Sequence, residues 1–200
     1  MRDYGDWAGF DHPEANERRA IRTAQMRGRR DELLVKYDLI HGHFIADKYS
    51  DMFPETRYVA FFRDPYQQAV AHYDFLRRNA QRDHPEERIF HEAKMTLHDY
   101  LRWDAFRDQQ SQFLGSVPIE AFTMVGLSDE YARSLALFRE VFGRDLGPER
   151  FENVNPTREN GAYAITPEIR TEVERHRPRD IELYRRAREK FAKQTARAGV

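Results

Sequence analysis

The sequence contains no cysteine among its 200 residues. This absence excludes disulfide scaffolds, thiolate metal sites and cysteine nucleophiles, and it fits a reducing compartment. No apolar run approaches the roughly 18 residues that a membrane span requires, and the charged segment from Met1 to Ala20 does not have the pattern of a signal peptide. We therefore expect a cytoplasmic protein without a membrane partner.

The chain also lacks an excess of charge of either sign, because 33 Lys and Arg stand against 34 Asp and Glu for a net charge of -1. General binding to nucleic acid relies on a basic excess, so the composition argues against that class of partner. Low-complexity segments, linkers and internal repeats are absent as well. The hydrophobic content of 40% exceeds that of disordered chains, and the length fits a single domain over residues 1–200.

Two segments read as a strand followed directly by a helix. Residues 57–63 are aromatic, β-branched and almost continuously apolar, which predicts a strand buried on both faces of a parallel sheet. Apolar residues then recur at helical spacing from Tyr66 to Ala80. The second unit has a predicted strand over 121–126 and a helix that ends at Gly143. This alternation predicts an α/β domain with a mostly parallel sheet flanked by helices.

The remaining segments complete this expected domain. Pro13 favours a helix start, so residues 1–36 are expected to form a helical N-terminal region, and 37–200 the α/β core with its C-terminal helices. Ser128 is expected to cap the helix of the second unit. Residues 96–103 are expected to be helical, and 108–118 to be irregular. Pro178 is expected to interrupt the C-terminal helix.

A charged residue lies where the strand over 57–63 is expected to end. Open parallel sheets bind ligands beyond the carboxyl ends of their strands, where helix N-termini supply N–H groups and partial positive charge. Arg63 lies at such an end, with Asp64 placed to cap the next helix and Pro65 to form its first turn. A guanidinium there is suited to bind an anion in two-pronged geometry. The alternative is a structural ion pair between Arg63 and a carboxylate.

Two histidines follow another expected strand, at His41 and His43. Residues two apart in an extended segment face the same side, so one imidazole could act as a base with the other in support, or both could bind a metal. Gly42 between them would let a substrate approach the backbone closely. A metal site lacks an evident third ligand, and structural histidines at a core edge are an equally open alternative.

Together these features resemble the sulfotransferase family, most closely the carbohydrate O-sulfotransferases related to heparan sulfate 2-O-sulfotransferase. The resemblance spans roughly Leu39 to Phe191 and depends on the shared order of its motifs. In order, these motifs are Ile40-His41-Gly42-His43-Phe44, Phe53-Pro54, Tyr58-Val59-Ala60-Phe61-Phe62-Arg63-Asp64-Pro65, His72-Tyr73-Asp74-Phe75-Leu76-Arg77, Gln110 with Gln112, Val125-Gly126-Leu127, Asn153-Val154-Asn155 with Arg158, and Asp180-Ile181-Glu182-Leu183-Tyr184.

The resemblance implies a P-loop-like α/β fold that binds 3'-phosphoadenosine 5'-phosphosulfate as co-substrate, without a metal. It implies transfer of the sulfuryl group to a hydroxyl of a carbohydrate or small-molecule acceptor. Arg63 then corresponds to the arginine that holds the 3'-phosphate of the donor, and His43 to the base that removes the acceptor proton, with His41 beside it. Arg158 either contacts a donor phosphate or an acidic sugar, or belongs to loop structure.

Two departures from the family pattern stand out. Ala71 occupies the position of a serine that contacts the 3'-phosphate, eight residues after Arg63. The N-terminal phosphosulfate loop, a Pro-Lys-[Thr/Ser]-Gly-[Thr/Ser]-like turn, is absent, and no convincing strand precedes His41. We therefore expect the first strand-loop-helix unit to be missing.

Two explanations of this departure are open. In the first, Met1 lies downstream of the true start of an enzyme. In the second, the chain is a truncated or degenerate noncatalytic binding module of the same family. An incomplete sheet would leave an unpaired edge, so self-association is also expected.

Overall fold

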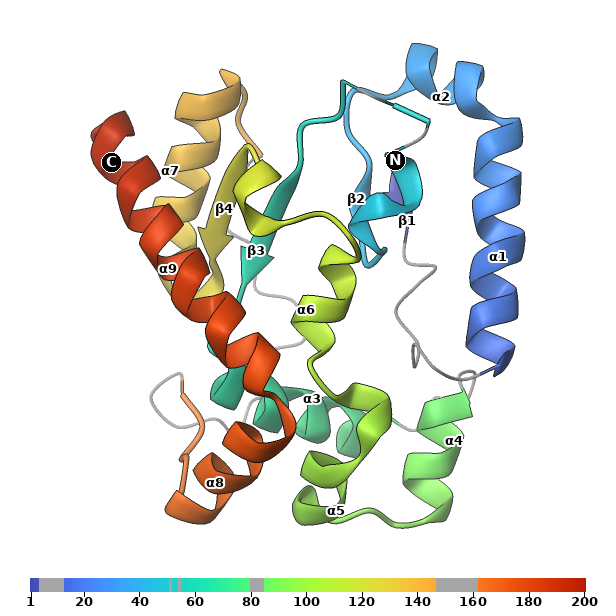
Figure 1. Cartoon of the computed structure of the whole chain (residues 1–200), viewed down its shortest axis with the longest axis vertical. Helices are drawn as coiled ribbons and strands as arrows, with labels where there is room; N and C mark the ends of the chain where they lie inside the picture. Colours follow the sequence, from blue (N-terminus) through green and yellow to red (C-terminus); the bar gives the residue numbers. More distant parts are fainter. Residues whose placement is uncertain (4–12, 51, 54, 80–84, 147–161) are drawn as a thin grey trace.

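The computed structural model describes residues 1–3, 13–50, 52–53, 55–79, 85–146 and 162–200. Helices account for 67% of it, and the strands form two small parallel sheets against which helices pack. One sheet contains β1 (Arg2–Asp3) and β2 (His41–Gly42), and the other contains β3 (Val59–Phe62) and β4 (Met124–Leu127). Figure 1 shows the helix α6 (Gln109–Leu114) between these two sheets.

The helix expected to start at Pro13 is present as α1 (Pro13–Gly28), and α2 (Arg30–Lys36) follows it, whereas Arg2 and Asp3 form a strand rather than a helix. The expectation that the first strand and helix are missing is wrong, because β1 pairs in parallel with β2 and α1 follows it. The segment that joins β1 to α1 lies outside the described residues. A strand of only two residues leaves no hydrophobic pattern in a sequence, which explains why it was not predicted.

The second sheet keeps the expected parallel pairing, with Phe61 beside Gly126 and Phe62 beside Leu127. All of β4 is buried, whereas β3 is half-buried except for Phe62, so burial on both faces applies to β4 rather than to β3. The expected mostly parallel sheet is instead two separate pairs of strands. The strands are short, and the described structure places α6 rather than another strand between the pairs.

Each strand of the second sheet leads to a helix, as the spacing predicts. After β3 comes α3 (Pro65–Arg78), and after β4 come the 3₁₀ turn η4 (Ser128–Glu130) and α7 (Tyr131–Phe142). Gly143 ends α7 with a φ of 63°, as expected for a helix C-terminus. Ser128 lies within η4 and does not cap α7, because the 3₁₀ turn moves the N-cap position two residues on, to Glu130.

The segment between the two strand-helix units is mostly helical. It contains α4 (Pro85–Glu92), α5 (Leu97–Arg102), η2 (Asp104–Phe106), α6 and η3 (Ile119–Ala121), while η1 (Ala46–Tyr49) follows β2. Thr96 caps α5 through a reciprocal capping box with Asp99. The expectation of irregular structure over residues 108–118 is therefore wrong where α6 forms.

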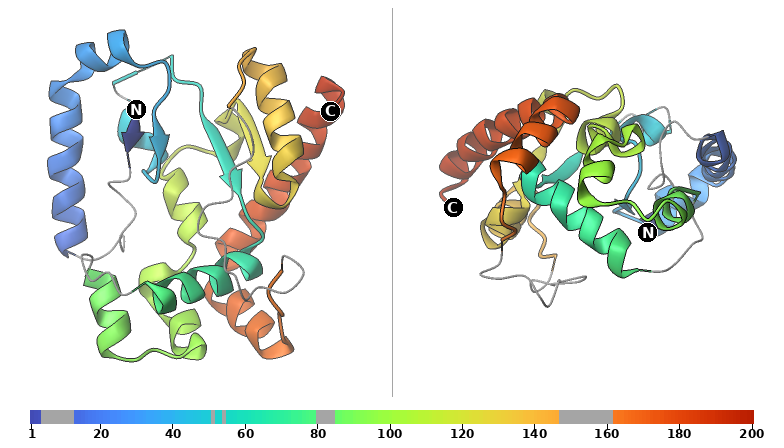
Figure 2. Two further views of the ribbon diagram at one scale, coloured as in Figure 1. Left: turned by 180° about the vertical axis from the view of Figure 1, so that it is seen from behind. Right: turned by 90° about the horizontal axis from the view of Figure 1, so that it is seen from below.

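Two C-terminal helices complete the fold, α8 (Pro167–His176) and α9 (Pro178–Ala198), and they meet at Pro178 as expected. One apolar cluster joins β4, α7 and α9, including Val125, Leu137 and Phe191, and a second joins α3, α4, α5 and α8 around Tyr100. The two views of Figure 2 agree that α3, α5 and α8 gather at one end of the molecule. Among the described residues, no helix is both long and apolar enough to cross a membrane.

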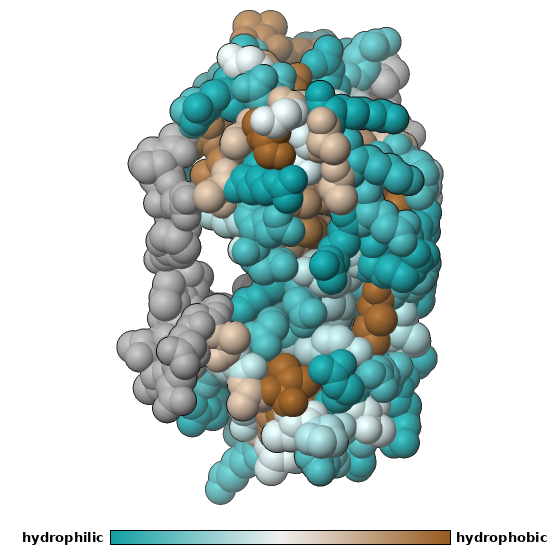
Figure 3. All heavy atoms as spheres, turned by 90° about the vertical axis from the view of Figure 1, so that its left-hand side faces the viewer, coloured by the Kyte–Doolittle hydropathy of each residue, from teal (hydrophilic) through white to brown (hydrophobic). Residues whose placement is uncertain are grey.

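The side of the molecule that carries α7 and α9 is predominantly hydrophilic, with hydrophobic side chains in small separate groups (Figure 3). The large exposed hydrophobic side chains among the described residues lie mainly elsewhere, on α1, α2 and the segment after α2. They include Ile21, Leu34 and Val35, of which Val35 is 91% exposed.

Candidate functional site

Arg63 is the first residue after β3, is half-buried, and immediately precedes the N-cap residue of α3, Asp64. The Asp64 carboxylate accepts hydrogen bonds from the Tyr66 and Gln67 backbone N–H groups at 2.9 and 3.0 Å, and Pro65 forms the first turn, as expected. Because Asp64 already occupies these N–H groups, the helix start does not offer them to an anion. An anion at this edge would depend on the Arg63 guanidinium and on the partial charge of the helix.

The backbone of Arg63 is held by the side chain of Gln110 from α6. The Arg63 N–H donates to Gln110 Oε1 at 2.9 Å, and Gln110 Nε2 donates to the Arg63 carbonyl at 3.0 Å. A side-chain amide thus satisfies both backbone groups at the point where β3 stops pairing with β4. The strand end is fixed, which in turn fixes the origin of the Arg63 side chain.

The two histidines have different surroundings. His41 pairs with Arg2 across the first sheet, and its backbone N–H donates to the Met1 carbonyl at 2.9 Å. Burial lowers the pKa of His41 first, followed by the charges of the N-terminus and Arg2. His43 follows β2, and its ring centroid lies 5.8 Å from that of Phe113 on α6. The strand ends at Gly42, so the expected two-residue alternation does not extend from His41 to His43.

Gly42 is needed for a different reason from the one that the sequence suggests. Its φ is 152°, and a Cβ atom there would lie 1.5 Å from the backbone oxygen of Asp3. The close approach at this glycine is therefore made by β1 of the same chain and not by a substrate.

His43 is exposed, yet the neighbouring protein removes enough water to lower the pKa of its imidazole. A histidine with a lowered pKa stays neutral at pH 7 and can accept a proton. Its position and protonation state are compatible with the role of a general base.

His72 of α3 interacts electrostatically with His43, and it was not predicted as a site residue. Its Nδ1 atom lies 2.8 Å from the Tyr100 hydroxyl, and its ring meets that of Phe106 edge to face at 4.8 Å between centroids. Burial lowers the pKa of His72 to about 3, with smaller contributions from Arg177 and His43. His72 therefore remains neutral while it interacts electrostatically with His43.

Arg177, between α8 and α9, carries a buried charge next to this group. It is 1% exposed, its Nη1 donates to the Leu101 carbonyl at 3.0 Å, and its guanidinium lies 5.4 Å from the Tyr100 ring centroid. Within the described part of the chain, no carboxylate lies within ion-pair distance of Arg177, and its Nε and Nη2 atoms have no hydrogen-bond partner. Its uncompensated charge helps to keep His72 neutral.

The two principal candidates, His43 and Arg63, share one neighbouring helix. Arg63 is bound through its backbone to Gln110, and His43 contacts Phe113 one turn further along α6. His41 does not join this group, since its described contacts are with the N-terminal strand. Ala71 lies half-buried on α3 and offers no side-chain donor, and Arg158 lies outside the described residues.

No group of three metal-ligating side chains occurs among the residues that the structure describes. The sequence between β1 and α1 contains no lysine or arginine. This segment of the sequence therefore supplies no permanently cationic side chain for a phosphate or sulfate group.

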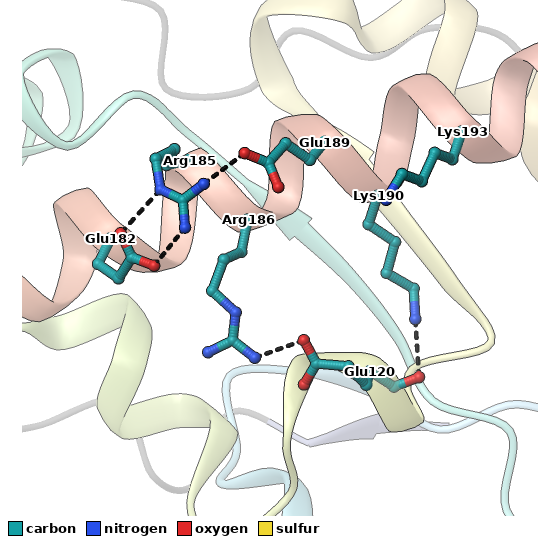
Figure 4. A pocket seen from close by; sticks show the side chains of 7 residues that line it. All are labelled: Glu120, Glu182, Arg185, Arg186, Glu189, Lys190 and Lys193. Atoms are coloured by element: carbon teal, nitrogen blue, oxygen red, sulfur yellow. Dashed lines mark hydrogen bonds and ion pairs between the residues drawn. The ribbon is translucent and has the colours of Figure 1, made fainter.

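A pocket whose lining residues are described lies elsewhere, between α9 and η3, with a volume of about 420 Å³ (Figure 4). Its charged lining is largely paired internally: Arg185 with Glu182 and Glu189, and Arg186 with Glu120. Lys190 Nζ donates to the Ile119 and Glu120 carbonyls at 3.0 and 2.8 Å. Since neither His43 nor Arg63 lines this pocket, we do not assign the candidate chemistry to it.

Comparison of the chain with family models, curated proteins and solved structures finds no significant match.

Proposed function

We propose that the chain is a sulfotransferase-like protein that transfers a sulfuryl group from 3'-phosphoadenosine 5'-phosphosulfate to a hydroxyl of a carbohydrate or small-molecule acceptor. The observation that carries this proposal is that His43 and Arg63 each follow a parallel strand and flank the same helix, α6. A neutral imidazole and a guanidinium near one helix supply a proton acceptor and an anion-binding group.

Sulfuryl transfer requires little covalent participation by the protein. His43 accepts the proton of the acceptor hydroxyl as the hydroxyl oxygen bonds to sulfur, and the bond between sulfur and the bridging phosphate oxygen breaks. The products are the sulfate ester and 3'-phosphoadenosine 5'-phosphate. Arg63 holds the 3'-phosphate through charge-assisted hydrogen bonds, and it does so without the N–H groups that Asp64 occupies.

The test is incubation with labelled donor and a panel of carbohydrate and small hydroxyl acceptors. We expect His43→Ala to lower kcat by about 10²- to 10⁴-fold, because the variant loses its general base. Arg63→Ala should weaken binding of 3'-phosphoadenosine 5'-phosphate by at least about tenfold, measured by calorimetry. The acidic limb of the kcat/KM profile should lie below pH 6.5, since the pKa of His43 is lowered.

His98→Ala and Arg139→Ala are the matched controls, because both side chains are exposed and belong to ion pairs away from α6. Both should retain activity. Transfer that survives His43→Ala and Arg63→Ala unchanged would remove the proposed site.

The second candidate is a noncatalytic binding module of the same family. It is favoured by the absence of a cation between β1 and α1 and by Ala71 on α3. It predicts weak or absent binding of 3'-phosphoadenosine 5'-phosphate. Tight binding of that nucleotide together with transfer would exclude it.

A further inference from the structure

Gln110 and Phe113 lie three residues apart on α6 and therefore share one face of the helix. Gln110 holds the backbone of Arg63 through two hydrogen bonds of 2.9 and 3.0 Å, and Phe113 contacts His43. Any shift or rotation of α6 therefore moves the supports of both candidate residues. In Figure 1 this helix lies between the two sheets that contain β2 and β3, the strands that His43 and Arg63 follow.

A carboxylate from a distant helix fixes the start of α6. Asp180 of α9, fully buried, accepts hydrogen bonds from the Gln110 and Ser111 N–H groups at 3.1 and 2.7 Å and from the Ser111 hydroxyl at 2.7 Å. Asp108 returns the contact, because its Oδ1 accepts from the Arg179 and Asp180 N–H groups at 2.9 and 3.1 Å. Each aspartate thus caps the helix of the other.

We propose that α6 is the common support of the site and that Gln110 and Asp180 are positioning residues for Arg63 and His43. The functional meaning of this inference rests on the proposed roles of those two residues. Gln110 sets the strand end from which the guanidinium projects. Asp180 fixes the start of α6, the helix that carries both Gln110 and Phe113.

Other glutamines provide a control for the purely structural effect of such a contact. Gln194 of α9 makes the same type of reciprocal amide contact with β4, since its Oε1 accepts from the Val125 N–H at 3.0 Å and its Nε2 donates to the Thr123 carbonyl at 2.8 Å. That contact lies at the beginning of β4, whereas Gln110 acts at the carboxyl end of β3. Gln112 also lies on α6, but its side-chain Nε2 donates to the Arg107 carbonyl and not to the backbone of a strand.

The test compares Gln110→Met with Gln194→Met and Gln112→Met in the full chain. Each substitution keeps an unbranched side chain and removes the amide. We expect Gln110→Met to weaken binding of 3'-phosphoadenosine 5'-phosphate by about tenfold, because the backbone of Arg63 loses both partners. The controls should bind within about twofold of the unsubstituted chain, even where Gln194→Met lowers the melting temperature by a similar amount.

A second measurement does not depend on nucleotide binding. Amide hydrogen exchange at Arg63 should accelerate in Gln110→Met, and the NMR signals of the His43 ring should shift in Asp180→Asn, while both stay unchanged in Gln112→Met. If the unsubstituted chain fails to bind nucleotide, the proposed function fails, and the exchange and NMR results alone decide on positioning. Unchanged exchange at Arg63 and an unchanged His43 signal would overturn the inference, as would equal nucleotide affinity for Gln110→Met and a nucleotide-binding parent chain.

Discussion

Single side chains decide the protonation states around the candidate site. His72 lies on the face of α3 that carries the buried residues Ala69, three positions before it, and Leu76, four positions after it; His72 as a whole is half-buried, and its Nε2 atom is buried. A histidine at that spacing among apolar residues was a signal in the sequence for a buried imidazole. Its partner Tyr100 belongs to α5, so the contact itself depends on tertiary packing.

The low pKa of His72 predicts that the free energy of unfolding depends on pH. The pKa is about 3 in the folded chain and near 6.5 when unfolded, so between these values the unfolded state binds more protons. Stability should therefore fall as pH decreases through this range, by up to about 1.4 kcal/mol per pH unit from this group. His72→Phe removes this pH-dependent contribution. The lost contact with Tyr100 changes the free energy of unfolding by an amount that does not depend on pH.

Urea unfolding at pH 7, 6 and 5 measures this effect as the difference in slope between the parent chain and His72→Phe. The control is His98→Ala, because the side chain of His98 is 51% exposed. Identical slopes for the parent chain and His72→Phe would contradict a neutral buried His72.

Predictions for single residues are confirmed where the contact joins residues close together in the sequence. Asp64 and Pro65 start α3 as predicted, because an N-cap acts on N–H groups two and three residues away. The contact between Gln110 and Arg63 spans 47 residues, and no spacing in the sequence encodes it. The residues of the candidate site could thus be nominated from the sequence, but the side chains that hold them could not.

At the level of helices and strands, several backbone N–H and C=O groups at element ends are hydrogen-bonded by side chains from distant parts of the sequence. The segment that forms α6 was expected to be irregular. Its N-cap residue, Asp108, makes no side-chain hydrogen bond to the start of α6, which is capped instead by Asp180, 70 residues away in the sequence. Gln110 and Gln194 similarly satisfy backbone groups, at the carboxyl end of β3 and at the beginning of β4. In a larger sheet, neighbouring strands would bind such groups.

The closeness of β1 and β2 leads to a second stability prediction. Gly42→Ala would force an L side chain into a φ of 152° and against the Asp3 backbone, so we expect a loss of at least about 2 kcal/mol of unfolding free energy. Gly28→Ala is the control, because nothing lies within 4 Å of its added Cβ. That change should be neutral or stabilising by up to about 1 kcal/mol.

Urea unfolding of both variants measures the contrast. A Gly42→Ala variant as stable as Gly28→Ala would show that the two strands do not approach each other as described.

For the molecule as a whole, the sequence predicted the parallel pairing and most helices but not the division into two sheets. Hydrophobic patterns identify segments that become strands, yet β1 and β2 have two residues each and leave almost no pattern. Which strands pair is decided by contacts between distant segments, such as the helix α6 that lies between the pairs. The short N-terminal strand could therefore be identified only from the structure and not from the sequence.

A buried ion pair ties this N-terminal strand to the rest of the molecule. Lys48 Nζ of η1 lies 2.8 Å from Asp3 Oδ2, with both side chains 3% exposed, and the Tyr49 hydroxyl donates to the same oxygen at 2.5 Å. The pair formed by Asp38 and Arg144 has a similar distance of 2.8 Å but is 78% and 66% exposed. Comparison of the two pairs separates the effect of burial from that of charge pairing.

Asp3→Ala should lower the free energy of unfolding by about 3–5 kcal/mol, because it removes a carboxylate partner from a buried ammonium group. Asp38→Ala should change it by less than about 1 kcal/mol, since water replaces the lost partner of Arg144. Adding Lys48→Met to Asp3→Ala should recover part of the loss, as the buried charge is then removed as well. Urea unfolding of the three variants gives these values, and equal losses for Asp3→Ala and Asp38→Ala would mean that the N-terminal strand does not anchor the fold through Lys48.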